Sequence, residues 1–368
     1  MKLGFFTMPI HPLGKDWRKS LAEDREAFLL AEELGFSEAY VGEHSTDQAE
    51  NITSCVAFLA WIAAATKRIK LGTGTVNLPN SHPGAVASTI AMLDHMLDGR
   101  FIFGISPGGL LSDAELFGNL DANRNEMFVE AINQVLAIWA GEPPYNLKGK
   151  YWTISTERTM MKEIGQGYIP LPLQRPHPPI VVTAVAPFSK GVTEAAIRGW
   201  DPISANFLMP AWVKSHWPKY AEGCEKGGRV ADPANWRVAK SIFVANDAKT
   251  AKAYATDPNG PYVYYYRSLF TKLVKNGRIE LFKTYRDQPN DEVTLEMVCD
   301  KLIIYGTPDK VADEILKFQE ETGEFGTLLY AGKDWTDPEL ARRSMILMAE
   351  QVMPQINAAG KSARAAAE

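Results

Sequence analysis

Short apolar runs alternate with longer amphipathic stretches along most of the chain. The runs have the continuous apolar character of strands buried on both faces, and they lie at 2–8, 37–42, 69–73, 101–105, 179–184, 202–205, 238–245 and 326–331. Helical spacing of apolar residues predicts helices at about 27–34, 53–67, 84–98, 124–140, 189–199, 210–226, 307–322 and 337–352. About eight strand–helix units in succession predict an α/β fold of the (β/α)₈ TIM-barrel type.

Three segments do not follow this alternation, at 143–178, at 256–296 and at the end of the chain. No glycine- or serine-rich linker and no shift of composition separates one part of the chain from another. We therefore predict a single barrel domain over 1–357, with insertions near 143–178 and 256–296. The small and charged residues at 358–368 are typical of a flexible tail.

The predicted helix at 53–67 is apolar on nearly all sides, whereas an outer helix of a monomeric barrel carries a polar outer face. Its apolar residues include Phe58 and Trp61. We interpret the helix as part of a homodimer interface. Burial beneath the 256–296 insertion is the alternative.

Composition narrows the function further. The chain has 368 residues and a net charge of −5 without a basic stripe, which argues against nucleic-acid and membrane-surface roles. The start, MKLGFFTMP, does not resemble a signal peptide, and the longest apolar stretch is short for a membrane span. Cys55, Cys224 and Cys299 are far apart, which is typical of free thiols in a reducing compartment. A cytoplasmic location is expected.

Active sites of barrels lie at the carboxyl ends of the strands, so the strand ends supply the candidate residues. The second strand is followed by Glu43 and His44, and the third by GTGTVNLPNSHP, which includes Asn77. The fourth ends at Ser106 before a Pro-Gly-Gly turn, and the fifth leads to a helix that begins near Ser189. A helix start of this kind offers free N–H groups to a phosphate, although a serine there more often only caps its helix.

The sequence lacks the motifs of several enzyme classes. There is no H-E-x-x-H, no G-x-S-x-G, no Walker loop and no dinucleotide fingerprint, and Glu43 has no convincing second carboxylate at a strand end. Six scattered histidines argue against a metal site. What remains is a cavity with small residues and few ionisable groups, which favours a flat cofactor.

The motifs VGEHS, GTGTVNLPNSHP, DGRFIFGISPGG, YGTPDKVADEI and FGTLLYAG occur in this order at barrel spacing. Together they resemble the bacterial luciferase-like flavin-dependent monooxygenases, and GEHSTDQAENI and LDHMLDGRFIFGISPG resemble the limonene and diketocamphane monooxygenase branch. The resemblance covers the chain from Lys2 to about Ile356. It implies a two-component enzyme that takes reduced FMN from a separate NAD(P)H:flavin reductase, by transient contact or free diffusion. The flavin would react with O₂ at C4a, as a hydroperoxide, and one oxygen atom would enter an organic substrate.

The resemblance also assigns roles to residues. His44 matches a histidine near the flavin that assists acid–base steps, and we expect Glu43 to brace it. Gly74 and Thr75 match a small pair against the flavin ring, often joined by a cis peptide bond. Ser106 stands where luciferase has a reactive cysteine, which makes light emission unexpected and leaves a hydrogen-bond donor near the flavin edge.

The resemblance places the flavin phosphate near Ser189, with Ala186 and Phe188 in the same loop. The family often has an arginine at the start of the fourth helix that pairs with this phosphate. Arg124 lies about one residue out of register with it, so a surface arginine is the alternative. His82 is interpreted as a structural residue.

We expect the substrate near Asn77 and the segment 260–283, which carries Tyr265 and Phe270 and forms either a lid or a fixed cover of the barrel. Aromatic residues there favour a small hydrophobic substrate such as a terpene, a cyclic ketone or an aldehyde. Two alternatives remain: an F420-dependent oxidoreductase on the same barrel, although no Lys/Arg cluster marks the strand ends, and a non-enzymatic flavin-binding protein.

Overall fold

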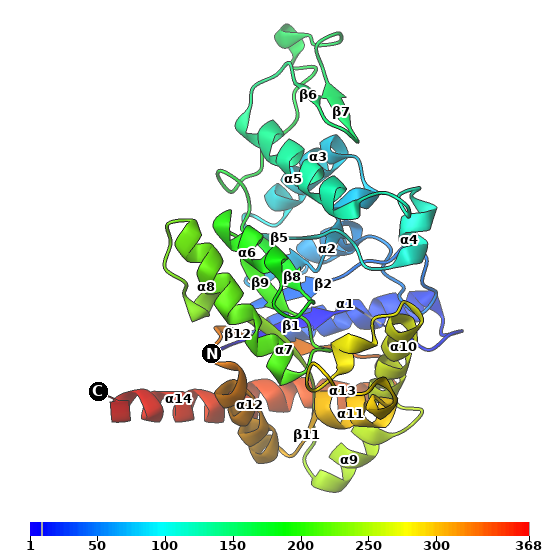
Figure 1. Cartoon of the computed structure of the whole chain (residues 1–368), viewed down its shortest axis with the longest axis vertical. Helices are drawn as coiled ribbons and strands as arrows, with labels where there is room; N and C mark the ends of the chain where they lie inside the picture. Colours follow the sequence, from blue (N-terminus) through cyan, green and yellow to red (C-terminus); the bar gives the residue numbers. More distant parts are fainter. Residues whose placement is uncertain (9, 368) are drawn as a thin grey trace. The chain divides into compact units, whose positions relative to one another are not determined.

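The structure is a computed structural model that describes residues 1–8 and 10–367, with side chains described as far as residue 360. Eight parallel strands form a closed (β/α)₈ barrel, which confirms the predicted fold (Figure 1). Hydrogen bonding follows the order β12-β1-β2-β3-β5-β8-β9, and β10 pairs with both β9 and β12. The barrel strands are β1 (Lys2–Thr7), β2 (Glu38–Val41), β3 (Lys70–Thr73), β5 (Phe101–Ser106), β8 (Ile180–Ala184), β9 (Asp201–Ser204), β10 (Arg237–Val244) and β12 (Thr327–Ala331).

The helices expected between these strands are present, except that the one expected at 210–226 is divided at Ser215 into two helices. They are α1 (Trp17–Glu33), α2 (Cys55–Ala63), α3 (Pro83–Met96), α5 (Arg124–Ala140), α6 (Lys190–Ile197), α7 (Pro210–Lys214), α8 (His216–Lys226), α12 (Pro308–Thr322) and α13 (Pro338–Leu347). Helix α2 begins later than expected because the Ser54 hydroxyl accepts the Ala57 N–H and so caps the helix. A π-helical segment, η6 (Met348–Val352), follows α13.

Several shorter elements were not expected from the sequence. Strand β11 (Ile303–Gly306) pairs with β10 outside the barrel, and β4 (Val76–Asn77) pairs with β5. The first insertion contains the hairpin β6 (Asn146–Lys148) and β7 (Thr153–Ser155). The second contains α10 (Pro261–Lys275), a longer helix in the segment 260–283, whose aromatic residues have helical spacing in the sequence. The helices α4 (Leu111–Leu116), α9 (Ala248–Thr256) and α11 (Leu295–Leu302) complete the set. The strands among them are two to four residues long, which is too short to show a periodic pattern.

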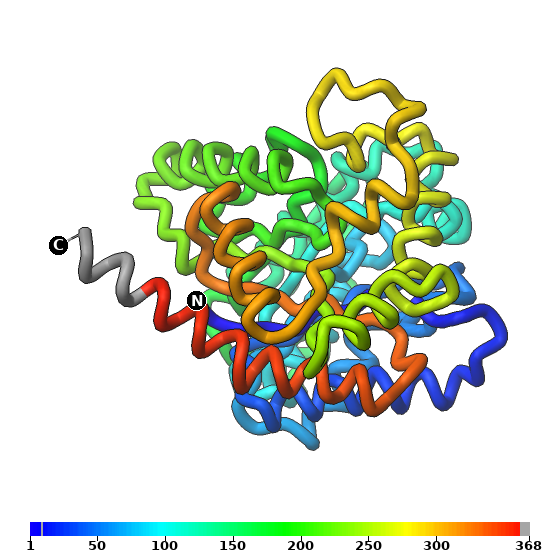
Figure 2. The backbone as a smooth tube through the Cα atoms, turned by 90° about the horizontal axis from the view of Figure 1, so that it is seen from below, coloured from blue at the N-terminus to red at the C-terminus, as the bar shows by residue number. Residues whose placement is uncertain are grey.

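The chain divides into two compact units, of which one comprises Met1–Ala39 and Val182–Glu368 and the other Tyr40–Val181. The first unit ends with α14 (Met353–Ala367), which packs beside α12 (Figure 2). Residues 358–360 of the expected tail belong to this helix, Glu368 lies outside the described residues, and the flexible tail over 358–368 stays a prediction. The single domain over 1–357 stays a prediction. Among the described helices, none is long and apolar enough to cross a membrane.

Close strand contacts in the Tyr40–Val181 unit depend on two glycines. A Cβ atom at Gly104 would overlap the carbonyl oxygen of Thr73 on the neighbouring strand. A Cβ atom at Gly72 would overlap the ring of Tyr40, which is fully buried. Strands β3 and β5 can therefore pack this closely against their neighbours only because Gly72 and Gly104 have no side chain. The close packing fixes the carboxyl ends of both strands.

Candidate active site

His44 lies just beyond the carboxyl end of β2 and is held between two carboxylates. Its Nδ1 atom is 3.1 Å from Asp113 Oδ2, and its Nε2 atom is 3.5 Å from Glu50 Oε2. Asp113 is in the first turn of α4, and the His44 side chain is 11% exposed. The ring is therefore placed by one residue near in sequence, Glu50, and one distant in sequence, Asp113.

Asp113 fixes the loop around His44 as well as its ring. Its carboxylate accepts the N–H groups of Ser45 and Thr46 at 3.1 and 2.9 Å, and the Thr46 hydroxyl at 2.6 Å. Burial opposes ionisation, but hydrogen bonds from His44 and Thr46 outweigh it and lower the pKa of Asp113. An ionised Asp113 only accepts hydrogen bonds, so His44 Nδ1 carries a proton, and Nε2 faces the Glu50 carboxylate.

Glu43, the residue before His44, hydrogen-bonds Cys55 and Asn77. Its Oε2 atom accepts the N–H and the thiol of Cys55, both at 3.0 Å, and Oε1 accepts the Asn77 N–H at 3.2 Å. Burial raises the pKa of this carboxyl. Glu43 thus joins the first residue of α2 to β4, while Asp113 is the carboxylate that bonds His44 Nδ1. That Glu43 braces the His44 ring stays a prediction.

Gly74 and Thr75 lie between β3 and β4, and the peptide bond between them is cis, as the resemblance implies. The Gly74 N–H donates to the Val41 carbonyl at 2.6 Å. Val76 and Asn77 of β4 follow this pair, so Gly74, Thr75 and Asn77 belong to one continuous segment beyond β3.

Ser106 is the centre of a small hydrogen-bond network. Its hydroxyl donates to Asn77 Oδ1 at 2.9 Å and accepts the hydroxyl of Thr75 at 2.7 Å and the N–H of Gly108 at 3.1 Å. Asn77 in turn donates to the Glu43 carbonyl at 3.3 Å. The single hydroxyl proton of Ser106 is thus used by Asn77, so the network does not support Ser106 as a donor to the flavin edge.

Ser189 occupies the N-cap position of α6, but its hydroxyl makes no cap hydrogen bond to the helix. The loop before it is anchored by the turn between α7 and α8. The Phe188 N–H donates to the Ser215 hydroxyl at 2.9 Å, and Phe188 has a positive φ of 52°. The Ala186 carbonyl accepts a hydrogen bond from His216 at 3.0 Å.

The hydrogen-bond directions around His216 follow from its partners. Its Nε2 atom must donate to Ala186, because a carbonyl oxygen only accepts. Burial lowers the pKa of His216 to about 4, so the ring is neutral near pH 7 and Nδ1 accepts the Ser204 hydroxyl at 2.8 Å. Ser204 accepts the indole N–H of Trp236 at 2.9 Å. The sequence did not predict this series of hydrogen bonds, because only folding brings its residues together.

Arg124 is the first residue of α5 and is partly exposed. Its guanidinium makes no hydrogen bond or ion pair within the described part of the chain. Asn123 caps the helix by accepting the Glu126 N–H at 3.2 Å, so Arg124 is not needed for that purpose.

Helix α10 is anchored along one face by tyrosine hydroxyls. Tyr265 donates to Asn206 Oδ1 at 3.1 Å, and Tyr266 donates to the Ser241 hydroxyl at 2.9 Å. Tyr262 donates to the Ile242 carbonyl at 2.5 Å. These hydrogen bonds indicate that α10 is a fixed cover rather than a moving lid. Phe270 lies further along the helix, with its ring centroid 5.5 Å from that of Phe282.

The chain is similar in sequence to a known protein family over most of its length. The family model described as luciferase-like monooxygenase matches residues 1–324. The chain belongs to the luciferase-like monooxygenase family. It is 31% identical over 364 residues to 4-hydroxyprotoasukamycin monooxygenase of Streptomyces nodosus subsp. asukaensis, covering 97% of this chain and 92% of that protein. It is 28% identical to limonene 1,2-monooxygenase of Rhodococcus erythropolis, covering 96% and 86%.

A solved structure resembles this luciferase-like monooxygenase over its whole length. It is the oxygenating constituent of 3,6-diketocamphane monooxygenase from Pseudomonas putida, described as a type II Baeyer–Villiger monooxygenase in complex with FMN. The TM-score is 0.85 at 27% identity, with 97% of this chain and 98% of the other covered. The predicted branch of the family is therefore confirmed.

An open groove of about 840 Å³ lies between α5 and the β6–β7 hairpin, and none of the predicted site residues lines it. His82, expected to be structural, accepts the Gly84 N–H at 3.2 Å and caps α3.

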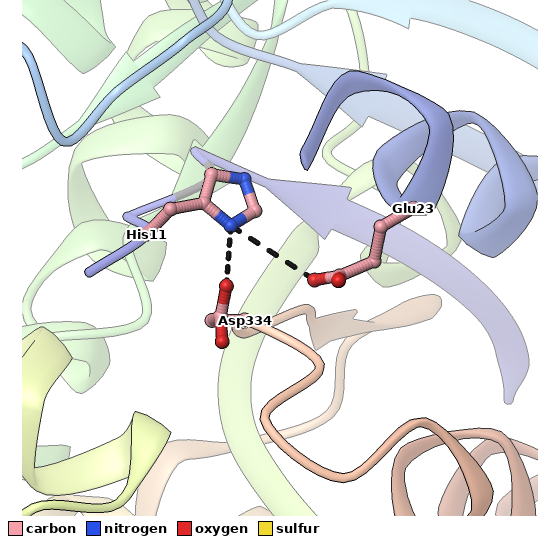
Figure 3. Close-up of side chains that lie close together, drawn as sticks. All are labelled: His11, Glu23 and Asp334. Atoms are coloured by element: carbon pink, nitrogen blue, oxygen red, sulfur yellow. Dashed lines mark hydrogen bonds and ion pairs between the residues drawn. The ribbon is translucent and has the colours of Figure 1, made fainter. Parts of the chain in front are cut away.

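His11, Glu23 and Asp334 bring one ligand atom each to within 4.8 Å of one another (Figure 3). His11 Nδ1 is 2.6 Å from Asp334 Oδ1, and Lys15 Nζ bonds Glu23 at 2.6 Å and Asp334 at 2.5 Å. The two cations already compensate these carboxylates. We therefore interpret the group as an ion-pair network, and the sequence-based expectation of no metal site stays a prediction.

Proposed function

We propose that the protein is the oxygenase of a two-component system, which uses reduced FMN and O₂ to insert one oxygen atom into a small hydrophobic substrate. A separate NAD(P)H:flavin reductase would supply the reduced flavin. The observation that carries this proposal is the full-length similarity to a structure described as an FMN complex. The flavin, when bound, supplies the oxygen chemistry.

The residues present fit a flavin with one phosphate. The Ser189 hydroxyl is not used by its own helix, and Arg124 makes no bond within the described residues. A helix start and an arginine are both suited to phosphate. Ser189 and Arg124 would hold the phosphate, Ala186 would contact it from the same loop, and Gly74 and Thr75 would lie against the ring.

His44 would hold or move a proton at its Nε2 atom. Asp113 keeps Nδ1 protonated and fixes the ring plane, so that Nε2 lies 3.5 Å from Glu50 Oε2, a carboxylate with which it could exchange the proton. Glu43 would position the segment after β2 through Cys55 and Asn77, and Asn77 would border the substrate beside that segment.

The substrate would contact the aromatic residues of α10, including Tyr265 and Phe270. Apolar and aromatic side chains exclude water, which the oxygenation requires. Terpenes, cyclic ketones and aldehydes all fit these surroundings, and the choice among them depends on polar groups near α10.

An F420-dependent oxidoreductase and a non-enzymatic flavin-binding protein are the alternatives. The relatives compared above are all named as monooxygenases, which favours oxygen insertion. Oxygen consumption with chemically supplied FMNH₂, compared with reduced F420, tests the proposal. We expect FMNH₂-dependent consumption that a screen of terpenes and cyclic ketones couples to an oxygenated product. Reaction with reduced F420 alone would contradict the proposal, and reaction with neither would favour the binding protein.

A further inference from the structure

Lys333 lies two residues beyond the end of β12, where barrel strands carry functional side chains. The residues that follow it are fixed by the ion-pair network around His11. Asp334 bonds His11 and Lys15, and the Trp335 N–H donates to Glu23 at 2.6 Å (Figure 3). The backbone on the carboxyl side of Lys333 is therefore held in place.

The Lys333 ammonium lies among aromatic rings of α10. Its Nζ atom is 3.9 Å from the ring centroid of Tyr265 and 5.8 Å from that of Tyr262. It donates to the carbonyls of Ala331 and Gly332 at 3.2 and 3.3 Å. Within the described part of the chain, no carboxylate lies within 4 Å of Nζ. An ammonium has three N–H donors, so one remains.

A cation in these surroundings is costly. Burial lowers the pKa of Lys333 to about 7, because the rings and carbonyls do not compensate the charge fully. Lys15, close by in the fold, shows the contrast: burial opposes its charge, but bonds to Asp334 and Glu23 outweigh this and raise its pKa. Uncompensated groups of this kind are concentrated at functional sites.

Another largely buried lysine has a structural explanation. Lys240 lies in the middle of β10, with Nζ 4.6 Å from the ring centroid of Phe318 on α12. Burial lowers its pKa to about 8, and Glu321 partly offsets this. Lys240 is thus a matched control, because it is a buried lysine on a ring but is not at a strand end.

We propose that Lys333 binds an oxygen atom of the substrate, so that the substrate class is ketones and phenols rather than hydrocarbons. This inference rests on the proposed function. One remaining N–H suits a single acceptor oxygen, whereas a carboxylate would use two donors. The Tyr265 ring beside the ammonium would face the carbon frame of the same substrate.

The test uses 4-nitrophenol and 4-nitrotoluene, which have similar shapes but differ in the oxygen. Binding to the full-length protein without flavin is measured by equilibrium dialysis at pH 6, below the pKa of about 7 of Lys333, so that the ammonium is charged and 4-nitrophenol keeps its proton. We expect the wild type to prefer 4-nitrophenol by about tenfold, the order expected for one hydrogen bond to a charged group. Lys333→Met should abolish this preference by weakening 4-nitrophenol alone, and Lys333→Gln, which keeps a neutral donor, should retain part of it. Lys240→Met should leave the preference unchanged.

Equal binding of the two compounds by the wild type, or an unchanged preference in a folded Lys333→Met or Lys333→Gln protein, would overturn the proposal. Circular dichroism establishes which variants are folded. Oxygen consumption with FMNH₂ in the same preparations tests the proposed function separately. If the protein consumes no oxygen with FMNH₂ but shows the Lys333-dependent preference, the proposed function is contradicted and the binding site at Lys333 is supported.

Discussion

His44 and Asp113 are separated by 69 positions in the sequence and meet in one hydrogen bond. The histidine can be recognised from its place after a strand, but its proton arrangement depends on the partner. Because Asp113 accepts from Nδ1 and from the adjacent loop, it determines which ring atom can act on a proton.

Replacement of His44 by Ala should reduce product formed per reduced flavin by about 10²-fold, the lower end for a placed acid–base group, with little change in FMN binding. Asp113→Asn should reduce it in the same direction, because the ring then loses its charged acceptor. Product yield by mass spectrometry and FMN affinity by fluorescence titration measure the two effects. His82→Asn, which keeps a helix cap, is the control, and unchanged coupling in His44→Ala would remove His44 from the mechanism.

A pH dependence of stability is expected from His11. Burial would lower the pKa of His11, but hydrogen bonds to Asp24 and Asp334 outweigh it and raise the pKa from 6.5 to about 9. The protonated ring therefore stabilises the fold fully below pH 6.5, and this contribution is lost as the pH rises through about 9.

Urea unfolding of the wild type and His11→Gln at several pH values measures this contribution. The stability difference should be on the order of 2 kcal/mol below pH 6.5 and should shrink toward pH 9. A difference that does not vary with pH would show that His11 is not charged in the folded protein.

Helix α6 and the loop before it form the element on which the phosphate proposal depends. The turn between α7 and α8 holds this loop by two hydrogen bonds, from Phe188 to Ser215 and from His216 to Ala186. The position of Ser189 is thus set by a neighbouring helix pair, and the proposed phosphate site requires both.

Ser215→Ala should weaken FMN binding about fivefold, because the Phe188 N–H loses its acceptor and one hydrogen bond is worth about 1 kcal/mol. Ser189→Ala should weaken it in the same direction. Ser88→Ala, which removes only a bond to Ala85 on an exposed helix face, is the matched control. Titration of FMN by fluorescence checks all three, and an unchanged affinity in both Ser189→Ala and Ser215→Ala would place the phosphate elsewhere.

At the scale of the whole molecule, exposed apolar side chains on α2 and α3 predict that the protein forms a homodimer. Phe58, Leu59 and Ile62 are buried in the structure, but Trp61 is 50% exposed. Met92 and Met96 on α3 are 56% and 47% exposed. Helices α2 and α3 pack together within one unit. We infer that this apolar surface is covered in a homodimer.

Trp61→Glu should shift the protein from dimer to monomer, because a carboxylate in an apolar interface would be left unpaired. Light scattering at micromolar concentration measures the mass of wild type and variant. Trp17→Glu is a control, since Trp17 is 57% exposed at the start of α1. A monomeric wild type would end the dimer proposal.

The sequence predicted all eight barrel strands and the helices between them, because burial on both faces and helical spacing are local patterns. It did not predict β11, whose four residues stand directly between two helices, or α4, whose Asp113 orients His44. It assigned Glu43 to His44 because the two are adjacent in sequence, and it did not predict the hydrogen bonds from Cys55 and Asn77 to Glu43. Ser106 was expected to be a donor because its own partner, Asn77, could not be read from the chain.

The sequence by itself therefore determined the barrel, the family and the strand-end residues, since each depends on order and spacing along the chain. Only the tertiary structure decided which proton-bearing atoms meet: His44 with Asp113, His216 with Ala186, and Lys333 with Tyr265. Hydrogen bonds and cation–π contacts act over a few ångströms, and the partners that satisfy them are brought within that range only when the strand ends and loops are folded.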